Sequence, residues 1–202
     1  MSRITSIAEL DVIYGAVSEA STIKVANHLT AGYRRLIEAS PIATLATVGP
    51  EGLDCSPRGD PGQVMVIEDD KTLILPDRRG NNRIDSLRNI VRDDRVALLF
   101  FIPGSNSTLR INGRAVVSIE PELLSRLAMD GKPPRTAIVI TIGEVYFQCA
   151  RALMRASLWD PGSWPDLATL PSPGDLMQEL KRDFDGESYD AQWPERAKAS
   201  LW

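Results

Sequence analysis

The feature that most constrains the fold is a series of apolar, β-branched segments, separated by short turns, in the middle of the chain. Segments with the composition of strands lie at residues 41–48, 53–60, 63–67, 72–75, 95–102, 108–119 and 135–149. Only two short helical patterns, near residues 82–91 and 120–128, come between them. Successive strands with so little helix predict an antiparallel barrel and not a doubly wound α/β sheet. We therefore expect a mainly β fold with flanking helices, and a bulge at Gly113 inside its long segment.

Different patterns flank this region on both sides. Residues 1–40 are expected to be helical, with a short helix ending at Gly15 and a longer one over residues 24–39. Residues 41–159 would form the barrel. Residues 160–202 begin with a Pro-, Gly- and Ser-rich stretch, yet they keep large apolar side chains that a solvated tail seldom carries. These are Trp164, Leu167, Leu170, Leu176, Met177, Leu180, Phe184, Trp193 and Trp202. We expect an ordered C-terminal arm that packs on the barrel or on a partner subunit.

Composition excludes several classes of protein. The chain has 202 residues and is 43% hydrophobic, which suffices for a core without metal or disulfide. Its two cysteines favour a reducing, cytoplasmic setting. A net charge of -4 and a pI of about 5.1 argue against non-specific nucleic-acid binding, and no stretch approaches the ~20 apolar residues of a membrane span. The single histidine, His28, excludes a histidine-rich metal site.

The run DRRGNNRIDSLRNI, residues 77–90, gathers anion-binding groups at the start of an amphipathic helix. Asn82 is expected to be the N-cap of this helix, with Asp85 returning a hydrogen bond to the cap. The apolar face of the helix is expected to hold Ile84, Leu87, Ile90 and Val91.

Two interpretations of this run are open from its residues alone. The N–H groups and the dipole of a helix start attract phosphate, and Arg78, Arg79 and Arg83 would add forked, charged hydrogen bonds. In the other interpretation the arginines are simply solvated and Asn82 is an ordinary cap. The carboxylate of Asp85 in the first turn counts slightly against a bound anion.

A second candidate site is CSPRGD, residues 55–60, where an extended segment breaks. Pro57 fixes φ there, and Gly59 allows close approach of the backbone. Ser56 and Arg58 supply donors for an anion or a carbonyl-rich ring. A plain surface turn is the alternative.

Five motifs occur in one order along the chain, with an apolar strand after the first: SPRGD, PDRRGNNRIDSLRNI, DDRVALLFFIPG, TLRINGRAVV and CARALMRASLW. Over about residues 20–160 this order resembles the pyridoxamine 5'-phosphate oxidase-like family of FMN-binding split barrels, and more closely a bacterial branch of it. The resemblance implies a six-stranded antiparallel split β-barrel. It also implies a homodimer with FMN in clefts between the subunits.

The resemblance further implies which residues contact FMN. Residues 54–60 match the strand at the flavin ring and phosphate, residues 82–83 match the phosphate-binding helix start, and residues 75–76 would lie beneath the ring. Arg151 and Arg155 share a helix face and would reach the partner's flavin or hold a carboxylate of the tail. The implied contacts are Cys55, Ser56, Pro57, Arg58, Gly59, Leu75, Pro76, Arg78, Arg79, Asn81, Asn82, Arg83, Thr108, Arg110 and Arg155.

The implied activity is that of an FMN-dependent oxidoreductase acting on a small organic substrate, with no catalytic side chain assigned. Residues 195–202 depart from the substrate-gripping, proline-terminated segment of true pyridoxamine phosphate oxidases, so a different substrate is expected. Gln63 and Gln148 also depart from the pattern of the branch, on the substrate side of the flavin. The alternative is a protein that stores flavin or deazaflavin without turnover. Haem is disfavoured because His28, the one imidazole that could ligate it, lies outside the barrel segments.

Overall fold

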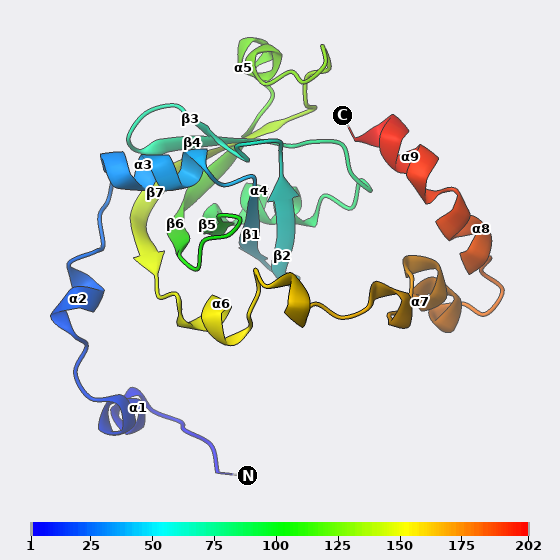
Figure 1. Ribbon diagram of the computed structural model, residues 1–202. Coiled ribbons are helices and arrows are strands. Elements are labelled where there is room, and N and C mark those ends of the chain that lie inside the picture. The colour runs from blue at the N-terminus through cyan, green and yellow to red at the C-terminus, as the bar shows by residue number, and fades with distance from the viewer. Residues whose placement is uncertain (1, 202) are drawn as a thin grey trace.

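The computed structural model describes residues 2–201, and its centre is one antiparallel sheet of seven strands in the order β2-β1-β5-β6-β7-β4-β3 (Figure 1). The strands are β1 (Ile42–Gly49), β2 (Gly52–Gly59), β3 (Val66–Ile67), β4 (Thr72–Pro76), β5 (Arg95–Phe101), β6 (Thr108–Ser118) and β7 (Ala137–Gln148). The predicted mainly β, antiparallel class is confirmed. The seventh strand is β3, which has two residues and pairs only with β4. Since β2 and β3 stand at the two edges, the curled sheet is not closed by hydrogen bonds.

The core lies inside the curl of this sheet. Along β1 and β5 burial alternates, so that every second side chain faces inward. Leu45 and Phe100 on these strands are completely buried. Ile37 and Ile90, from two helices that lie on the barrel, belong to the same core cluster. The position of each side chain along a strand therefore decides whether it joins the core or faces outward.

Helices and short 3-10 turns flank the sheet. They are α1 (Ile7–Tyr14), α2 (Glu19–Thr22), α3 (Ala31–Glu38), α4 (Asp85–Arg92), α5 (Pro121–Arg126), α6 (Arg151–Arg155), η1 (Pro161–Ser163), η2 (Leu167–Thr169), α7 (Pro173–Leu180), α8 (Gly186–Ala191) and α9 (Trp193–Ser200). Among residues 2–201 no helix has the length and apolar character needed to cross a membrane.

The helix expected over residues 24–39 was predicted too long. It begins at Ala31, where Thr30 caps it by accepting a hydrogen bond from the N–H of Tyr33. Upstream, Ala26 exchanges two backbone hydrogen bonds with Val145 of β7 instead. The pairing between β4 and β7 ends at residue 141, so the edge of β7 beyond it has free backbone groups that Ala26 satisfies.

The predicted start of α4 was also wrong. Its N-cap residue is Ile84, in a left-handed conformation without a side-chain cap, and Asn82 lies outside the helix. The buried face consists of Ser86, Asn89 and Ile90, whereas Ile84 and Val91 are exposed and Leu87 is partly buried. Asn89 is turned inward because its amide donates to Thr47 Oγ1 at 3.1 Å. Gly49 allows this approach, since a Cβ there would lie 2.1 Å from the Asn89 Oδ1 atom.

The bulge expected at Gly113 is confirmed. The register between β6 and β7 shifts between Asn112 and Gly113. A Cβ on Gly113 would lie 2.2 Å from the carbonyl oxygen of Thr141. Only glycine allows the two strands to approach this closely.

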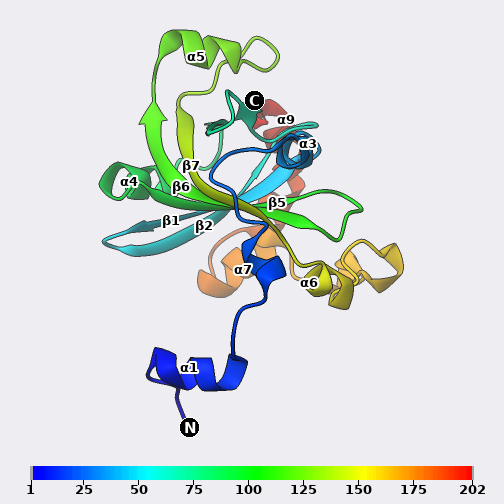
Figure 2. The same ribbon diagram turned by 90° about the vertical axis from the view of Figure 1, so that its left-hand side faces the viewer.

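Two arms extend from the barrel at the ends of the chain (Figures 1 and 2). In the C-terminal arm α7 packs on α8 and α8 on α9, while the Trp159 indole N–H just before it donates to the Ser105 carbonyl at 2.7 Å. Trp164, Leu180 and Trp193 of the arm are exposed. Met1 and Trp202, the end residues of the two predicted terminal segments, lie outside the described residues. The docking of this arm stays a prediction.

Candidate anion-binding site

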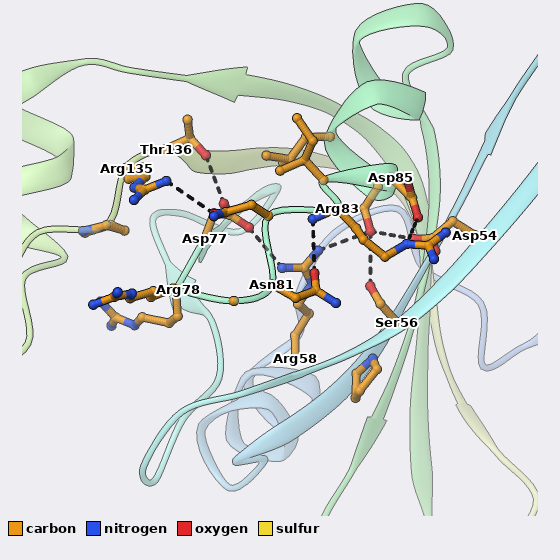
Figure 3. Close-up of a pocket in the computed structure, with 18 of the residues that line it drawn as sticks. Asp54, Ser56, Arg58, Asp77, Arg78, Asn81, Arg83, Asp85, Arg135 and Thr136 are labelled. Carbon is orange, nitrogen blue, oxygen red and sulfur yellow. Dashed lines mark hydrogen bonds and ion pairs between the residues drawn. The ribbon is translucent and has the colours of Figure 1, made fainter. Parts of the chain in front are cut away.

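A cavity of about 580 Å³ opens at one end of the sheet (Figure 3). It forms there because Pro76, at the end of β4, pairs with Ala137, at the start of β7. The segments next to these two residues are therefore neighbours, and the Asp77 N–H donates to the Thr136 carbonyl at 3.0 Å. The cavity is lined by Asp54, Ser56, Pro57, Arg58, Asp77, Arg78, Arg79, Gly80, Asn81, Asn82, Arg83, Ile84, Asp85, Ser86, Leu87, Lys132, Pro133, Pro134, Arg135 and Thr136.

One wall of the cavity is a polar network between β2 and the first turn of α4. Alternation along β2 turns Asp54, Ser56 and Arg58 to the same side. The hydroxyl of Ser86 lies at their centre and donates to Asp54 Oδ2 at 2.6 Å. It also accepts from Arg58 Nη2 at 3.1 Å and lies 3.0 Å from Ser56 Oγ. The network fixes the position of the Arg58 guanidinium.

Arg58 keeps one donor unsatisfied. Its Nη1 group donates to Asp77 Oδ1 at 3.0 Å, and Thr136 Oγ1 donates to the second oxygen of the same carboxylate at 3.4 Å. The Nε–H of Arg58 is buried and has no hydrogen-bond partner within the described part of the chain. A buried donor without a partner is costly, and a bound acceptor would remove that cost.

The basic side chains of the cavity differ in what they contact. Arg78 turns to Asp60, with Nε and Nη2 at 2.8–3.1 Å from the carboxylate oxygens, and its Nη1 donates to the Leu127 carbonyl at 2.7 Å. Arg83 donates to Asp85 at 2.8 Å. The charges of these two arginines are therefore compensated by carboxylates of the chain itself.

The other basic groups at the mouth of the cavity have no such partner. Arg79, Lys132 and Arg135 form no ion pair with any carboxylate between residues 2 and 201. Arg135 Nη1 donates only to the neutral Asn82 side-chain oxygen, at 3.3 Å. Six basic and three acidic side chains line the cavity in all. Its mouth can thus accept a doubly charged anion through charge-assisted hydrogen bonds.

The entry into α4 is strained where it borders the cavity. Asn82 and Ile84 have φ values of 60° and 54°, and a β-branched residue in this region is an outlier. The left-handed conformation costs about 1–2 kcal/mol for a residue with a Cβ. Because Ile84 cannot cap the helix, the first N–H groups of α4 have no side-chain acceptor from the N-cap. The positive end of the helix dipole faces the same region.

About half of the residues expected to contact the cofactor are brought together here. Those that line the cavity are Ser56, Pro57, Arg58, Arg78, Arg79, Asn81, Asn82 and Arg83. Cys55 and Gly59 belong to the opposite face of β2, which is exposed. Leu75 and Pro76 are buried in the barrel at the end of β4.

Thr108, Arg110 and Arg155 lie elsewhere in this chain. Ser118, at one end of β6, pairs with Ala137 beside the cavity, whereas Thr108 pairs with Gln148 at the other end. Ten residue steps of β-strand separate these ends by roughly 30 Å. Arg110 donates to the Tyr146 hydroxyl at 3.2 Å, and α6 with Arg155 follows the end of β7.

Several lining residues were not predicted. Lys132, Arg135 and Thr136 come from the loop before β7, and Asp77 and Ser86 complete the network. The run KPPRT, residues 132–136, carries a local signal, since two basic residues flank a rigid Pro-Pro pair before a strand. The pairing of that strand with β4 carries no such signal in the sequence.

The cavity offers positive charge and hydrogen-bond donors to a ligand. Its lining side chains include no histidine or cysteine, and His28 is exposed and contacts Asn27. Among residues 2–201 no group of three His, Cys, Asp or Glu side chains could hold a metal. Redox or group-transfer chemistry here would come from a bound cofactor.

Comparisons with known proteins give one family match and several distant structural likenesses. The sequence model described as pyridoxamine 5'-phosphate oxidase matches residues 29–149, and no curated protein matches the chain. HupZ of Group A Streptococcus has 20% identity and a TM-score of 0.46, covering 58% of this chain and 91% of HupZ. A general stress protein 26-related protein from Clostridium acetobutylicum has 17% identity and a TM-score of 0.45, covering 58% and 85%. The FAD binding protein from Mycobacterium smegmatis has 10% identity and a TM-score of 0.42, covering 61% and 97%.

Proposed function

Because this chain belongs to the pyridoxamine 5'-phosphate oxidase family, we propose that it binds FMN and acts as an oxidoreductase on a small organic substrate. The observation that carries the proposal is a group of three basic side chains beside the start of α4, Arg79, Lys132 and Arg135. Within residues 2–201 they form no ion pair with a carboxylate. Two negative charges of a phosphate monoester suit this group. The cavity volume, about 580 Å³, lies within the range of about 300–1,000 Å³ typical of ligand sites.

The proposal gives the lining residues separate roles. Arg79, Lys132 and Arg135 hold the phosphate, together with the first N–H groups of α4. The Nε–H of Arg58, buried and unpaired, supplies a fixed donor deeper in the site. Arg78 holds the loop in place through Asp60 and does not itself contact phosphate.

FMN, when bound, supplies the hydride and electron chemistry. The chain orients the cofactor and fixes the charges around it. Arg58 is held by Asp77 and Ser86, so it can stabilise negative charge beside the flavin without moving. No side chain is assigned as a general acid or base.

We propose that the functional unit is a homodimer with each FMN between two subunits. Antiparallel sheets usually expose polar side chains on their outer face. Here the outward positions of β1, β5, β6 and β7 carry apolar side chains, among them Val48, Ala97, Val116 and Val139. A second copy covering this face would also bring the partner's Arg110 toward the cofactor, together with the partner's Thr108 and Arg155, which lie far from the cavity in their own chain.

A flavin or deazaflavin storage protein is the second candidate. Both candidate proteins would bind the flavin phosphate at the same site, but only the oxidoreductase would reduce and reoxidise the flavin with a substrate. The free, exposed Cys55 and Cys149 fit a reducing, cytoplasmic compartment for either one.

The test begins with the absorption spectrum of the purified protein and titrations with FMN and riboflavin. We expect FMN to bind at least about tenfold more tightly than riboflavin, and Arg79→Ala to remove most of that difference. Arg88→Ala is the matched control, because Arg88 is exposed on α4 and does not line the cavity. Equal affinity for FMN and riboflavin would contradict the phosphate site.

Anaerobic addition of a reduced nicotinamide separates the two candidates. Bleaching of the flavin, followed by reoxidation in air or with a small organic acceptor, supports the oxidoreductase. A flavin that stays oxidised with each donor supports storage.

A further inference from the structure

The segment of residues 2–23, here called the N-terminal arm, exposes an unusual amount of apolar surface. None of the residues of α1 is buried, although the helix reads IAELDVIY. Its large apolar residues and those beside it are exposed to between 37% and 87%. They are Ile4, Ile7, Leu10, Val12, Ile13, Tyr14, Val17 and Ile23. A helix that is apolar on several sides is stable in a protein only when another surface covers it.

The chain holds the end of this arm firmly at residues 24–33. Ala26 and Val145 exchange backbone hydrogen bonds of 3.0 and 2.7 Å. The Lys24 ammonium lies 4.9 Å from the centroid of the Phe147 ring, and the Tyr33 hydroxyl donates to the Lys24 carbonyl. The arm therefore leaves the barrel from a fixed point beside β7, and α1 stands clear of the sheet (Figure 2).

A groove of about 980 Å³ runs over the outer face of β1, β5, β6 and β7. Leu53 at its rim and Val116 on its floor are 86% and 60% exposed. No described segment of the chain fills this groove. Within residues 2–201, each chain thus has one apolar arm that no other segment covers and one apolar groove that no segment fills.

The two match in size. A helix of eight residues is about 12 Å long. The groove crosses the four neighbouring strands β1, β5, β6 and β7, which together span about 14 Å at ~4.8 Å between strands. In a pair of chains, the arm of each can therefore lie in the groove of the other. Such an exchange forms a closed two-fold dimer in which both arms and both grooves are covered.

We propose that the N-terminal arm of one chain lies in the groove of a second copy, with α1 on the floor that Val116 exposes. This inference rests on the proposed homodimer and names the part of the partner that fills its interface. The proposed exchange also fixes how the subunits are placed, because each arm starts from a fixed point beside β7 of its own chain.

The test uses the full chain and two single substitutions, Ile13→Asp in the arm and Val116→Asp in the groove. Both residues are exposed within one chain, so the fold is retained, which circular dichroism checks. We expect each substitution to raise the dimer dissociation constant at least about tenfold in sedimentation velocity. The dissociation constant of the double variant should not exceed that of the single variant that dimerises less tightly, because both changes break the same contact.

Val91→Asp is the matched control, since Val91 is equally apolar and 77% exposed on α4 but lies outside the groove. It should leave the dissociation constant unchanged. The exchange would be overturned if the effects of Ile13→Asp and Val116→Asp on the free energy of dimerisation were additive. It would also be overturned if neither substitution changed the dissociation constant. Protection of Leu10 and Tyr14 from chymotrypsin that does not depend on protein concentration would also overturn it, because the arm would then lie in the groove of its own chain.

FMN titration of the same variants separates this inference from the proposed function. If the double variant still forms a dimer and binds FMN normally, the arm exchange is contradicted and the proposed function is not. If the wild-type chain is monomeric at every concentration and binds FMN tightly, both the proposed dimer and the arm exchange are contradicted.

Discussion

The ion pair between Arg78 and Asp60 distinguishes Arg78 from Arg79 and Arg135, the arginines proposed to bind the anion, and Asp60→Asn tests that pair. The Arg78 and Asp60 side chains are only 16% and 6% exposed. Three hydrogen bonds of 2.8–3.1 Å join them, and a fourth links Arg78 to the Leu127 carbonyl. Asparagine keeps the size of aspartate but removes the charge. The substitution therefore leaves a largely buried guanidinium without its counter-ion.

The magnitude follows from the burial of the pair. Removing one partner of a buried ion pair costs about 3–5 kcal/mol. The new asparagine side chain would still accept one hydrogen bond and Arg78 is not fully buried, so we expect a loss of about 2–4 kcal/mol in the free energy of unfolding. For a chain of this length that loss lowers the melting temperature by about 5–15 °C.

The measurement is urea unfolding of the apoprotein, with the midpoint compared at constant slope. The control is Glu68→Gln, which removes the carboxylate from the exposed pair of Arg126 and Glu68. An exposed pair contributes about 0–1 kcal/mol. If Asp60→Asn shifts the midpoint no more than Glu68→Gln does, the ion pair with Asp60 is not what holds Arg78 in place.

Three further predictions concern other parts of the chain. Arg83→Ala should lower FMN affinity less than Arg79→Ala, because a carboxylate at 2.8 Å already compensates Arg83; parallel titrations with equal losses would contradict this. The Arg95 side chain donates to Asp93 and lowers the pKa of that carboxyl from 3.8 to about 2. The stabilisation by this hydrogen bond is therefore present above pH 3.8 and is lost as the pH falls through about 2, and NMR titration of the Asp93 carboxyl carbon measures the pKa. Gly113→Ala should destabilise the barrel by about 1–3 kcal/mol in urea unfolding, because the new methyl group overlaps a backbone carbonyl of β7; an unchanged midpoint would show that the strands can separate there.

The sequence predicted the strands well because their signal is local. Apolar, β-branched segments bounded by turn residues specify β1, β5, β6 and β7 almost to their ends. The bulge at Gly113 was likewise predictable, since a glycine inside a long strand pattern usually marks a bulge or a close approach of two backbones. For the arginine run, the residues alone left anion binding and simple solvation both open, and only the family resemblance favoured the anion.

The helix starts were less predictable, because a contact elsewhere decides them. Residues 24–28 have a helical pattern, but the free edge of β7 offers them backbone partners at Ala26. Asn82 has the chemistry of a cap, yet the chain reaches α4 through left-handed Asn82 and Ile84. In both places tertiary structure overrides local propensity.

The sequence by itself determined that this chain forms an antiparallel β fold and that residues 77–90 gather basic side chains before a helix. Only the tertiary structure decided which of those charges are available. Arg78 and Arg83 are compensated by Asp60 and Asp85, whereas Lys132 and Arg135 join the site from a loop some fifty residues further along. The physical reason is that ion pairs and strand pairing depend on distances in space, and residue order does not encode the distance between β4 and β7.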